Sequence, residues 1–165
     1  MDPFYAWIEH TALSIWIRES LSIFAFPGIL TLHTLGLAFL AGTQVAIDLR
    51  ILGVASLVPI APLRRFFVVS WCAFWVSLVT GMLLVVAYPA KALTNPLFYV
   101  KLTLITLATW TAVRVGSALA VGAGEGDAGA ASARRLAAAS ILLWTGAIVS
   151  GRLLAYTYTR LLSDL

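Results

Sequence analysis

The chain has 165 residues, of which 61% are hydrophobic and 11% are charged, and its net charge is +4. Soluble domains are about half apolar and about a quarter charged, so this composition excludes an ordinary soluble domain and predicts a membrane protein. Basic loops of a membrane protein account for the positive charge. No basic patch interleaved with aromatic residues is present, so we expect no nucleic-acid binding.

The N-terminal segment is predicted to start a helix at Asp2-Pro3, because Asp caps helices and Pro suits the first helical position. Residues 3–20 mix tryptophan and isoleucine with glutamate, histidine and arginine, which makes the segment too charged to span a bilayer. We expect an amphipathic helix lying in the membrane interface, with a helix packed on the bundle as the alternative. No basic region or cleavage site of a signal peptide is visible, so no cleaved leader is expected.

Four apolar runs follow, each long enough to cross a bilayer, and 165 residues allow a single domain, 1–165, that holds all four. Pro27 lies in the first turns of the first run, where proline is tolerated. The Gly- and Ala-rich stretch 122–132 is predicted to be a flexible loop. The fold predicted is an all-α integral membrane protein, a bundle of four transmembrane helices with an N-terminal interfacial helix. The predicted spans are 23–47, 66–88, 96–121 and 136–158.

Basic residues are distributed unevenly between the two sides of the predicted bundle. The connections after the first and third spans, with the adjoining helix ends, hold six arginines, and the opposite side holds three basic residues. Because basic loops stay in the cytoplasm, this bias places both termini on the other side, which in a bacterium is the periplasm. We therefore expect a protein of the bacterial inner membrane, in contact with the lipid bilayer.

Three ionisable residues fall inside the predicted spans, where such side chains are costly and therefore mark candidate functional sites. His33 lies in the first span, Lys101 in the third and Arg152 in the fourth. At about 100° per residue, His33 shares a helical face with Gly36 and Gln44. Lipid would leave both polar side chains of that face unsatisfied, so the face is predicted to point into the bundle.

The other two residues lie on helical faces of different character. Lys101 shares its face with two alanines at a spacing of four, a smooth strip that suits helix packing or a flat ligand. Arg152 shares its face with Thr145 and Tyr156, and this polar strip is predicted to face inward. Structural alternatives remain open for all three: an interhelical hydrogen bond for His33, snorkelling for the lysine, and binding of carbonyls or lipid head groups for the arginine.

The three residues lie at comparable depths in the predicted bundle. His33 is roughly 14 Å from the end of its span and Lys101 is roughly 8 Å from the end of its own, at a rise of about 1.5 Å per residue. Neutral imidazole is a common axial ligand of haem iron, and basic side chains pair with carboxylates such as haem propionates. We expect His33 to ligate the metal of a haem b, Lys101 to be a second ligand, a propionate anchor or a catalytic group, and Arg152 to anchor a propionate.

Five runs distributed over almost the whole chain form a recognisable pattern: WIEHTALSIWIRES, HTLGLAFLAG, DLRILG, NPLFYVKL and SGRLLAY. This pattern resembles a family of small bacterial integral membrane proteins known as a domain of unknown function. The resemblance implies a membrane protein of four helices and implies no activity.

Two shorter features carry a second resemblance. Leu-His followed by small residues lies in the first predicted span, and Lys-Leu opens the third. These features are similar to those of HemJ-type protoporphyrinogen oxidases and of the membrane domain of copper-resistance protein D. In the HemJ type, a membrane histidine and a lysine form the functional pair and haem b is bound. The matching positions in this chain are His33 and Lys101.

The function that these observations favour is the binding of b-type haem or porphyrin between helices, for redox chemistry or electron transfer. The alternatives are a non-enzymatic membrane subunit or scaffold, in which the three residues bond between helices, and a small transporter. A second copy of the chain or a partner membrane protein is the expected protein partner. Whether the protein is an enzyme stays open at this point.

Overall fold

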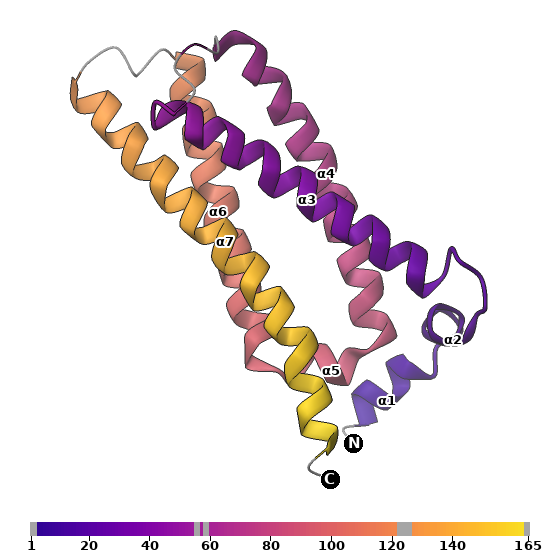
Figure 1. Ribbon diagram of the computed structural model, residues 1–165. Coiled ribbons are helices and arrows are strands. Elements are labelled where there is room, and N and C mark those ends of the chain that lie inside the picture. The colour runs from indigo at the N-terminus through magenta and orange to yellow at the C-terminus, as the bar shows by residue number, and fades with distance from the viewer. Residues whose placement is uncertain (1–2, 55–56, 58–59, 122–126, 164–165) are drawn as a thin grey trace.

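The computed structural model describes residues 3–54, 57, 60–121 and 127–163, and every regular element in them is a helix (Figure 1). Four of these helices are long and apolar enough to cross a membrane, which confirms the predicted fold class. The helices are α1 Pro3–Glu9, α2 Ala12–Glu19, α3 Phe26–Ile51, α4 Ile60–Ala87, α5 Pro89–Leu93, α6 Pro96–Val121 and α7 Asp127–Ser163.

The four long helices form two pairs. α3 packs along α4, α6 packs along α7, and contacts between α3 and α7 join the two pairs (Figure 1). α4 and α6 hardly touch within the described part of the chain, which leaves one side of the bundle open. α1 and the end of α7 lie at the same end of the bundle, called the termini end below, and the opposite end is called the loop end.

Apolar packing occurs at three levels of the bundle. At each level a helix of the first pair meets its neighbour through small or branched side chains, as expected for helices that associate without a hydrophobic driving force in lipid. The buried members are Ile17, Ile29 and Ala87 at the termini end, Leu40, Ala41, Ala73, Ala108 and Trp144 in the middle, and Ile47 and Val115 toward the loop end.

The N-terminal segment is two helices rather than the single helix predicted for residues 3–20. The break falls at Thr11, whose side-chain oxygen accepts a hydrogen bond from the backbone N–H of Ser14 at 3.4 Å. A threonine in this position satisfies an orphan N–H of the helix that follows, so it starts α2 afresh. The prediction of one continuous helix missed this cap.

α2 packs on the bundle, which was the alternative to an interfacial position. Its Ile17 is fully buried in a cluster with Ala87, and its Ser14 hydroxyl donates to the Ala87 carbonyl at 3.5 Å. The opposite face of the segment keeps large apolar side chains exposed, in a composition suited to the membrane interface. These exposed residues are Phe4, Trp7, Leu13 and Trp16.

The predicted flexible loop 122–132 is helical in its second half. Residues 122–126 lie outside the described residues, but α7 begins at Asp127 and runs on through Ser132. Three alanines in these six residues have the highest helix propensity of any residue type, and they extend the helix beyond the predicted start of the span. α3 likewise continues past the predicted end of the first span, to Ile51.

A glycine sets the close approach of α3 to α4. A Cβ atom on Gly36 would lie 2.5 Å from the hydroxyl oxygen of Ser77 and 3.3 Å from the backbone carbonyl oxygen of Ala73. The carbonyl belongs to the α4 backbone and cannot rotate away, so a side chain here would push the two helices apart. Gly42, on the same helix, has nothing within 4 Å of its Cβ position.

We expect Gly36→Ala to lower the free energy of unfolding by about 1–3 kcal/mol, the usual cost of overpacking a close contact. Thermal unfolding in detergent micelles measures the change. Gly42→Ala is the matched control, since it adds the same methyl group in open space and should leave the midpoint nearly unchanged. Equal losses at the two positions would show that α3 and α4 are not packed as described.

Candidate functional site

His33 extends from α3 toward α4 and is bonded to it through one ring nitrogen. Its Nδ1 lies 3.0 Å from the backbone carbonyl oxygen of Ser77 and 3.2 Å from the hydroxyl oxygen of Thr80. A carbonyl oxygen only accepts hydrogen bonds, so Nδ1 carries the proton. In the neutral ring, Nε2 is then left with a free lone pair, which is the form in which histidine binds metals.

Two neighbours on α4 hold the His33 ring in this position. The Thr80 hydroxyl donates to the Val76 carbonyl of its own helix at 2.6 Å, so its oxygen faces the ring as an acceptor. A Cβ on Gly81 would lie 3.1 Å from His33 Cε1, so the glycine provides the space that the ring occupies. α4 therefore provides both the hydrogen-bond acceptors and the space for the imidazole ring.

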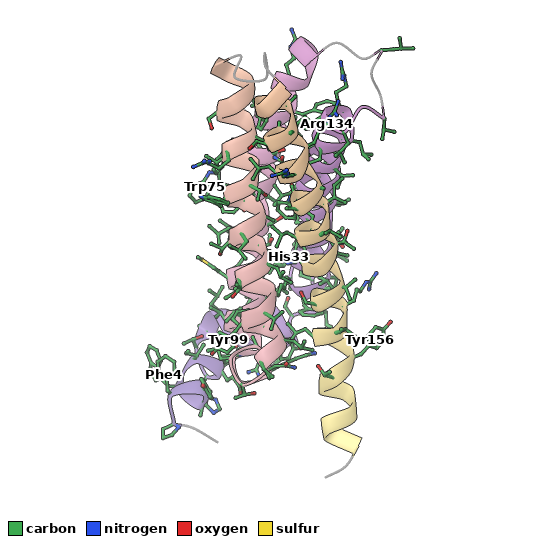
Figure 2. The ribbon with its side chains drawn as sticks, turned by 90° about the vertical axis from the view of Figure 1, so that its left-hand side faces the viewer. Phe4, His33, Trp75, Tyr99, Arg134 and Tyr156 are labelled. Carbon is green, nitrogen blue, oxygen red and sulfur yellow. The ribbon has the colours of Figure 1, made fainter. Side chains whose placement is uncertain are left out.

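The His33 face of α3 points into the bundle, as predicted. Ile29, Gly36, Leu40 and Gln44 on that face are all buried. Figure 2 shows His33 about midway along the bundle, with Arg134 toward the loop end and Tyr156 toward the termini end. Two polar side chains lie on this otherwise apolar face. Lipid would leave both without hydrogen-bond partners, so burial within the bundle satisfies the face better than contact with lipid.

Lys101 of α6 crosses the surface of α7 at a glycine. A Cβ on Gly151 would lie 3.5 Å from Lys101 Cε and 3.6 Å from its Nζ. The side chain is half-buried and makes no hydrogen bond or ion pair with any other described residue. The hydrogen bonds of the His33 ring in the described structure go to Ser77 and Thr80, and none goes to Lys101.

Arg152 does not join this pair, and the predicted inward orientation of its polar strip is wrong. Arg152, Thr145 and Tyr156 are all exposed, and Figure 2 shows Tyr156 directed away from the bundle. The face of α7 that turns inward carries Trp144 and otherwise small residues, which allow close helix packing. Arginine and tyrosine can instead reach the membrane surface from an outward position. The inward residues include Ala137, Ser140, Ala147 and Ser150.

The surroundings of His33 limit the kinds of metal it can hold. Among the described residues, no group of three or more His, Cys, Asp or Glu side chains lies close enough together to bind an ion. A metal held by protein side chains alone commonly needs three or four of them. A metal that brings its own ligands, such as iron in a porphyrin, needs only one or two.

Sequence reasoning did not identify Ser77, Thr80 and Gly81 as partners of the histidine. Ser77 and Gly81 were visible as small residues one turn apart on the second span, which marks a packing face but gives no partner. Thr80 lies 47 positions from His33, and only the pairing of α3 with α4 brings it to the ring. Asp48 was predicted to follow the first span, yet it is buried within α3.

No protein-family model, no curated protein and no solved structure matches this chain. The fold defines a small integral membrane protein with four candidate spans. Its function has to be argued from the site itself.

The His33 tautomer is directly measurable. We expect nitrogen NMR of the protein in lipid, with 15N-labelled histidine, to show a protonated Nδ1 and an unprotonated Nε2 for the neutral ring, because Ser77 offers only an acceptor. His10→Ala leaves His33 as the one histidine of the chain and removes any ambiguity of assignment. A protonated Nε2 would contradict the hydrogen bond to Ser77.

Proposed function

We propose that this protein binds a b-type haem or a porphyrin between its helices and uses it for redox chemistry or electron transfer, with His33 as the iron ligand. The observation that carries this proposal is the hydrogen bond from His33 Nδ1 to the Ser77 carbonyl. Histidines that ligate metals commonly donate their other ring N–H to a carbonyl or carboxylate, which fixes the tautomer and the ring orientation. The contact of His33 Nδ1 with the Ser77 carbonyl has this arrangement.

The region around His33 has features that suit a flat ligand. Gly81 and Gly151 carry no side chains, and the space beside them is taken by the His33 ring and the Lys101 side chain, which are the two groups that would hold the ligand. His33 does not line the described cavity of about 390 Å³, which lies further along α3. A macrocycle at His33 would therefore need space between the helices that this cavity does not provide.

Haem b bound here would supply one-electron chemistry. His33, Lys101 and Arg152 would each hold a different part of it. His33 Nε2 would take the iron. Lys101 would act as a second ligand in its neutral form or, as an ammonium, pair with a propionate. Arg152 is exposed on an outward face of α7, so its guanidinium would anchor a propionate only where that group reaches the outer surface of the bundle.

The second candidate is a non-enzymatic membrane subunit or scaffold. One observation favours it: the hydrogen bond of His33 joins α3 to α4 directly. In that case His33 and Lys101 contribute to stability and to the choice of helix partners, as polar groups inside membranes often do. The two candidates differ in a property that is visible by eye, because only a haem protein is coloured.

The absorption spectrum of the purified protein separates these candidates. Protein from cells supplied with a haem precursor is expected to show a Soret band that shifts when dithionite is added. His33→Ala should abolish the band, because the iron loses its fixed ligand. Arg152→Ala should keep the band and weaken haem retention by about five-fold, since exposed ion pairs contribute up to about 1 kcal/mol.

His10→Ala is the matched control, because His10 is exposed and remote in sequence from the site. It should leave the spectrum unchanged. A colourless, folded protein that takes up no added haemin would contradict the haem proposal and favour the non-enzymatic membrane subunit or scaffold. Loss of thermal stability in His33→Ala without any spectral change would lead to the same conclusion.

A further inference from the structure

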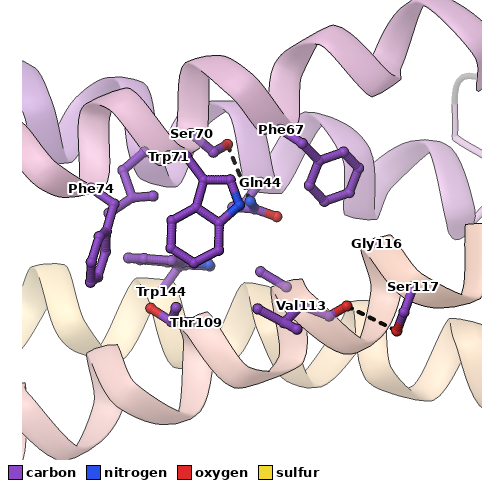
Figure 3. Close-up of a pocket in the computed structure, with 12 residues that line it drawn as sticks. Gln44, Phe67, Ser70, Trp71, Phe74, Thr109, Val113, Gly116, Ser117 and Trp144 are labelled. Atoms are coloured by element: carbon purple, nitrogen blue, oxygen red, sulfur yellow. Dashed lines mark hydrogen bonds between the residues drawn. The ribbon is translucent and has the colours of Figure 1, made fainter. Parts of the chain in front are cut away.

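A cavity of about 390 Å³ lies between α4 and α6 on the open side of the bundle (Figure 3). Leu40 and Gln44 of α3 and Trp144 of α7 form its floor, and residues 67–74 of α4 and 109–117 of α6 form its walls. Leu40 is seven residues from His33 along α3, a rise of about 10 Å. The cavity is thus separate from the His33 site.

Three polar atoms of the cavity lining are buried and make no hydrogen bond within the described structure. These atoms are Gln44 Oε1, Thr109 Oγ1 and Trp144 Nε1. The side chains of Gln44 and Trp144 are only 3% and 1% exposed. Gln44 Nε2 donates to the Ser70 hydroxyl at 3.1 Å, which holds the amide in place and leaves its oxygen unpaired (Figure 3).

The unpaired atoms specify what a ligand must offer. Trp144 Nε1–H only donates, Gln44 Oε1 only accepts, and the Thr109 hydroxyl does either. A ligand that satisfies all three therefore carries both a hydrogen-bond donor and an acceptor. Buried polar groups without partners are costly, so such a ligand would supply hydrogen bonds that these three atoms do not make within the described structure.

The rest of the lining limits the ligand further. No charged side chain lines the cavity, so an ionised ligand would lose its hydration without compensation. Phe67, Trp71 and Phe74 present aromatic surfaces on which a planar ring can pack. Trp71 is also 45% exposed on the outer surface of α4, so the cavity opens toward the surroundings of the span. That surface faces hydrocarbon in a bilayer.

We propose that this cavity binds the ring of an isoprenoid quinol from the membrane. The ring is planar and uncharged, its hydroxyl groups both donate and accept, and its apolar tail can leave through the opening between α4 and α6. One hydroxyl donates to Gln44 Oε1, and a ring oxygen accepts from Trp144 Nε1–H. The proposal does not depend on haem at His33.

The test is calorimetric titration of the purified, delipidated protein with decylubiquinol, kept reduced under argon. Saturable binding is expected. Trp144→Phe keeps an aromatic ring and removes the donor, and Gln44→Leu removes the acceptor, so each should weaken binding by about 3–10-fold, the effect of one neutral hydrogen bond. Ser140→Ala is the matched control, because Ser140 is a fully buried hydroxyl outside the lining, and binding should not change.

Decylbenzene, which has the ring and tail but no oxygen, is the second probe. It should bind at least 10-fold more weakly than decylubiquinol. Equal binding of the two probes, with no effect of the Trp144 and Gln44 variants, would show an unspecific lipid groove and overturn the proposal. Absence of saturable binding to wild-type protein with an intact thermal transition would overturn it as well. Because Trp144 packs in the core, each variant is compared only after its thermal transition is shown to persist.

Discussion

The hydrogen bond from His33 to the Ser77 carbonyl is the contact on which the arrangement of the first helix pair depends. The hydrocarbon core offers no water, so a polar side chain inside a span has to find its partner on its own helix or on a neighbour. α3 meets this requirement on α4 at two levels. His33 bonds to Ser77 and Thr80, and about three turns further along α3 Gln44 bonds to Ser70. Gly36 lies between these levels and lets the helices come close enough for both.

The bundle separates two polar regions with different chemistry. His33 and Lys101 form a region with a titratable ring and a cation, whereas Gln44, Thr109 and Trp144 form an uncharged region on the open side. The apolar cluster around Leu40 forms part of the cavity lining at the uncharged region. A histidine region suits a metal ligand and an uncharged cavity suits a lipid-soluble ring, so the two proposals assign each region the ligand that its side chains can satisfy.

Much of the fold follows from the sequence because two signals are strong. Apolar length predicts the four spans, and helical periodicity predicts that the His33 face and the two alanines near Lys101 turn inward, where Ala108 and Ala112 are indeed buried. Arg152 shows the limit of this reasoning. α7 carries both a polar strip and a strip of small residues, and the choice between them is made by what α3 and α6 present, which periodicity within one helix does not reveal.

The details of the candidate site depend on pairing between distant segments, and this is why sequence reasoning did not find them. Thr80 and Gly81 contact His33 only because α3 and α4 run side by side in one register. The cavity is a property of four helices together, since its lining comes from α3, α4, α6 and α7. The break between α1 and α2 at Thr11, in contrast, depends on a local signal. The capping threonine is visible in the sequence, but the segment was predicted to be one continuous helix.

The most direct test of the central claim, that Nε2 of His33 binds iron, is pulsed electron paramagnetic resonance of the ferric, haem-loaded protein with 15N-labelled histidine in the His10→Ala background. In that background His33 is the chain's only histidine. The account predicts a strong hyperfine coupling from one 15N nucleus to the iron. A ferric signal without 15N coupling, or one that is identical in His33→Ala, would contradict it.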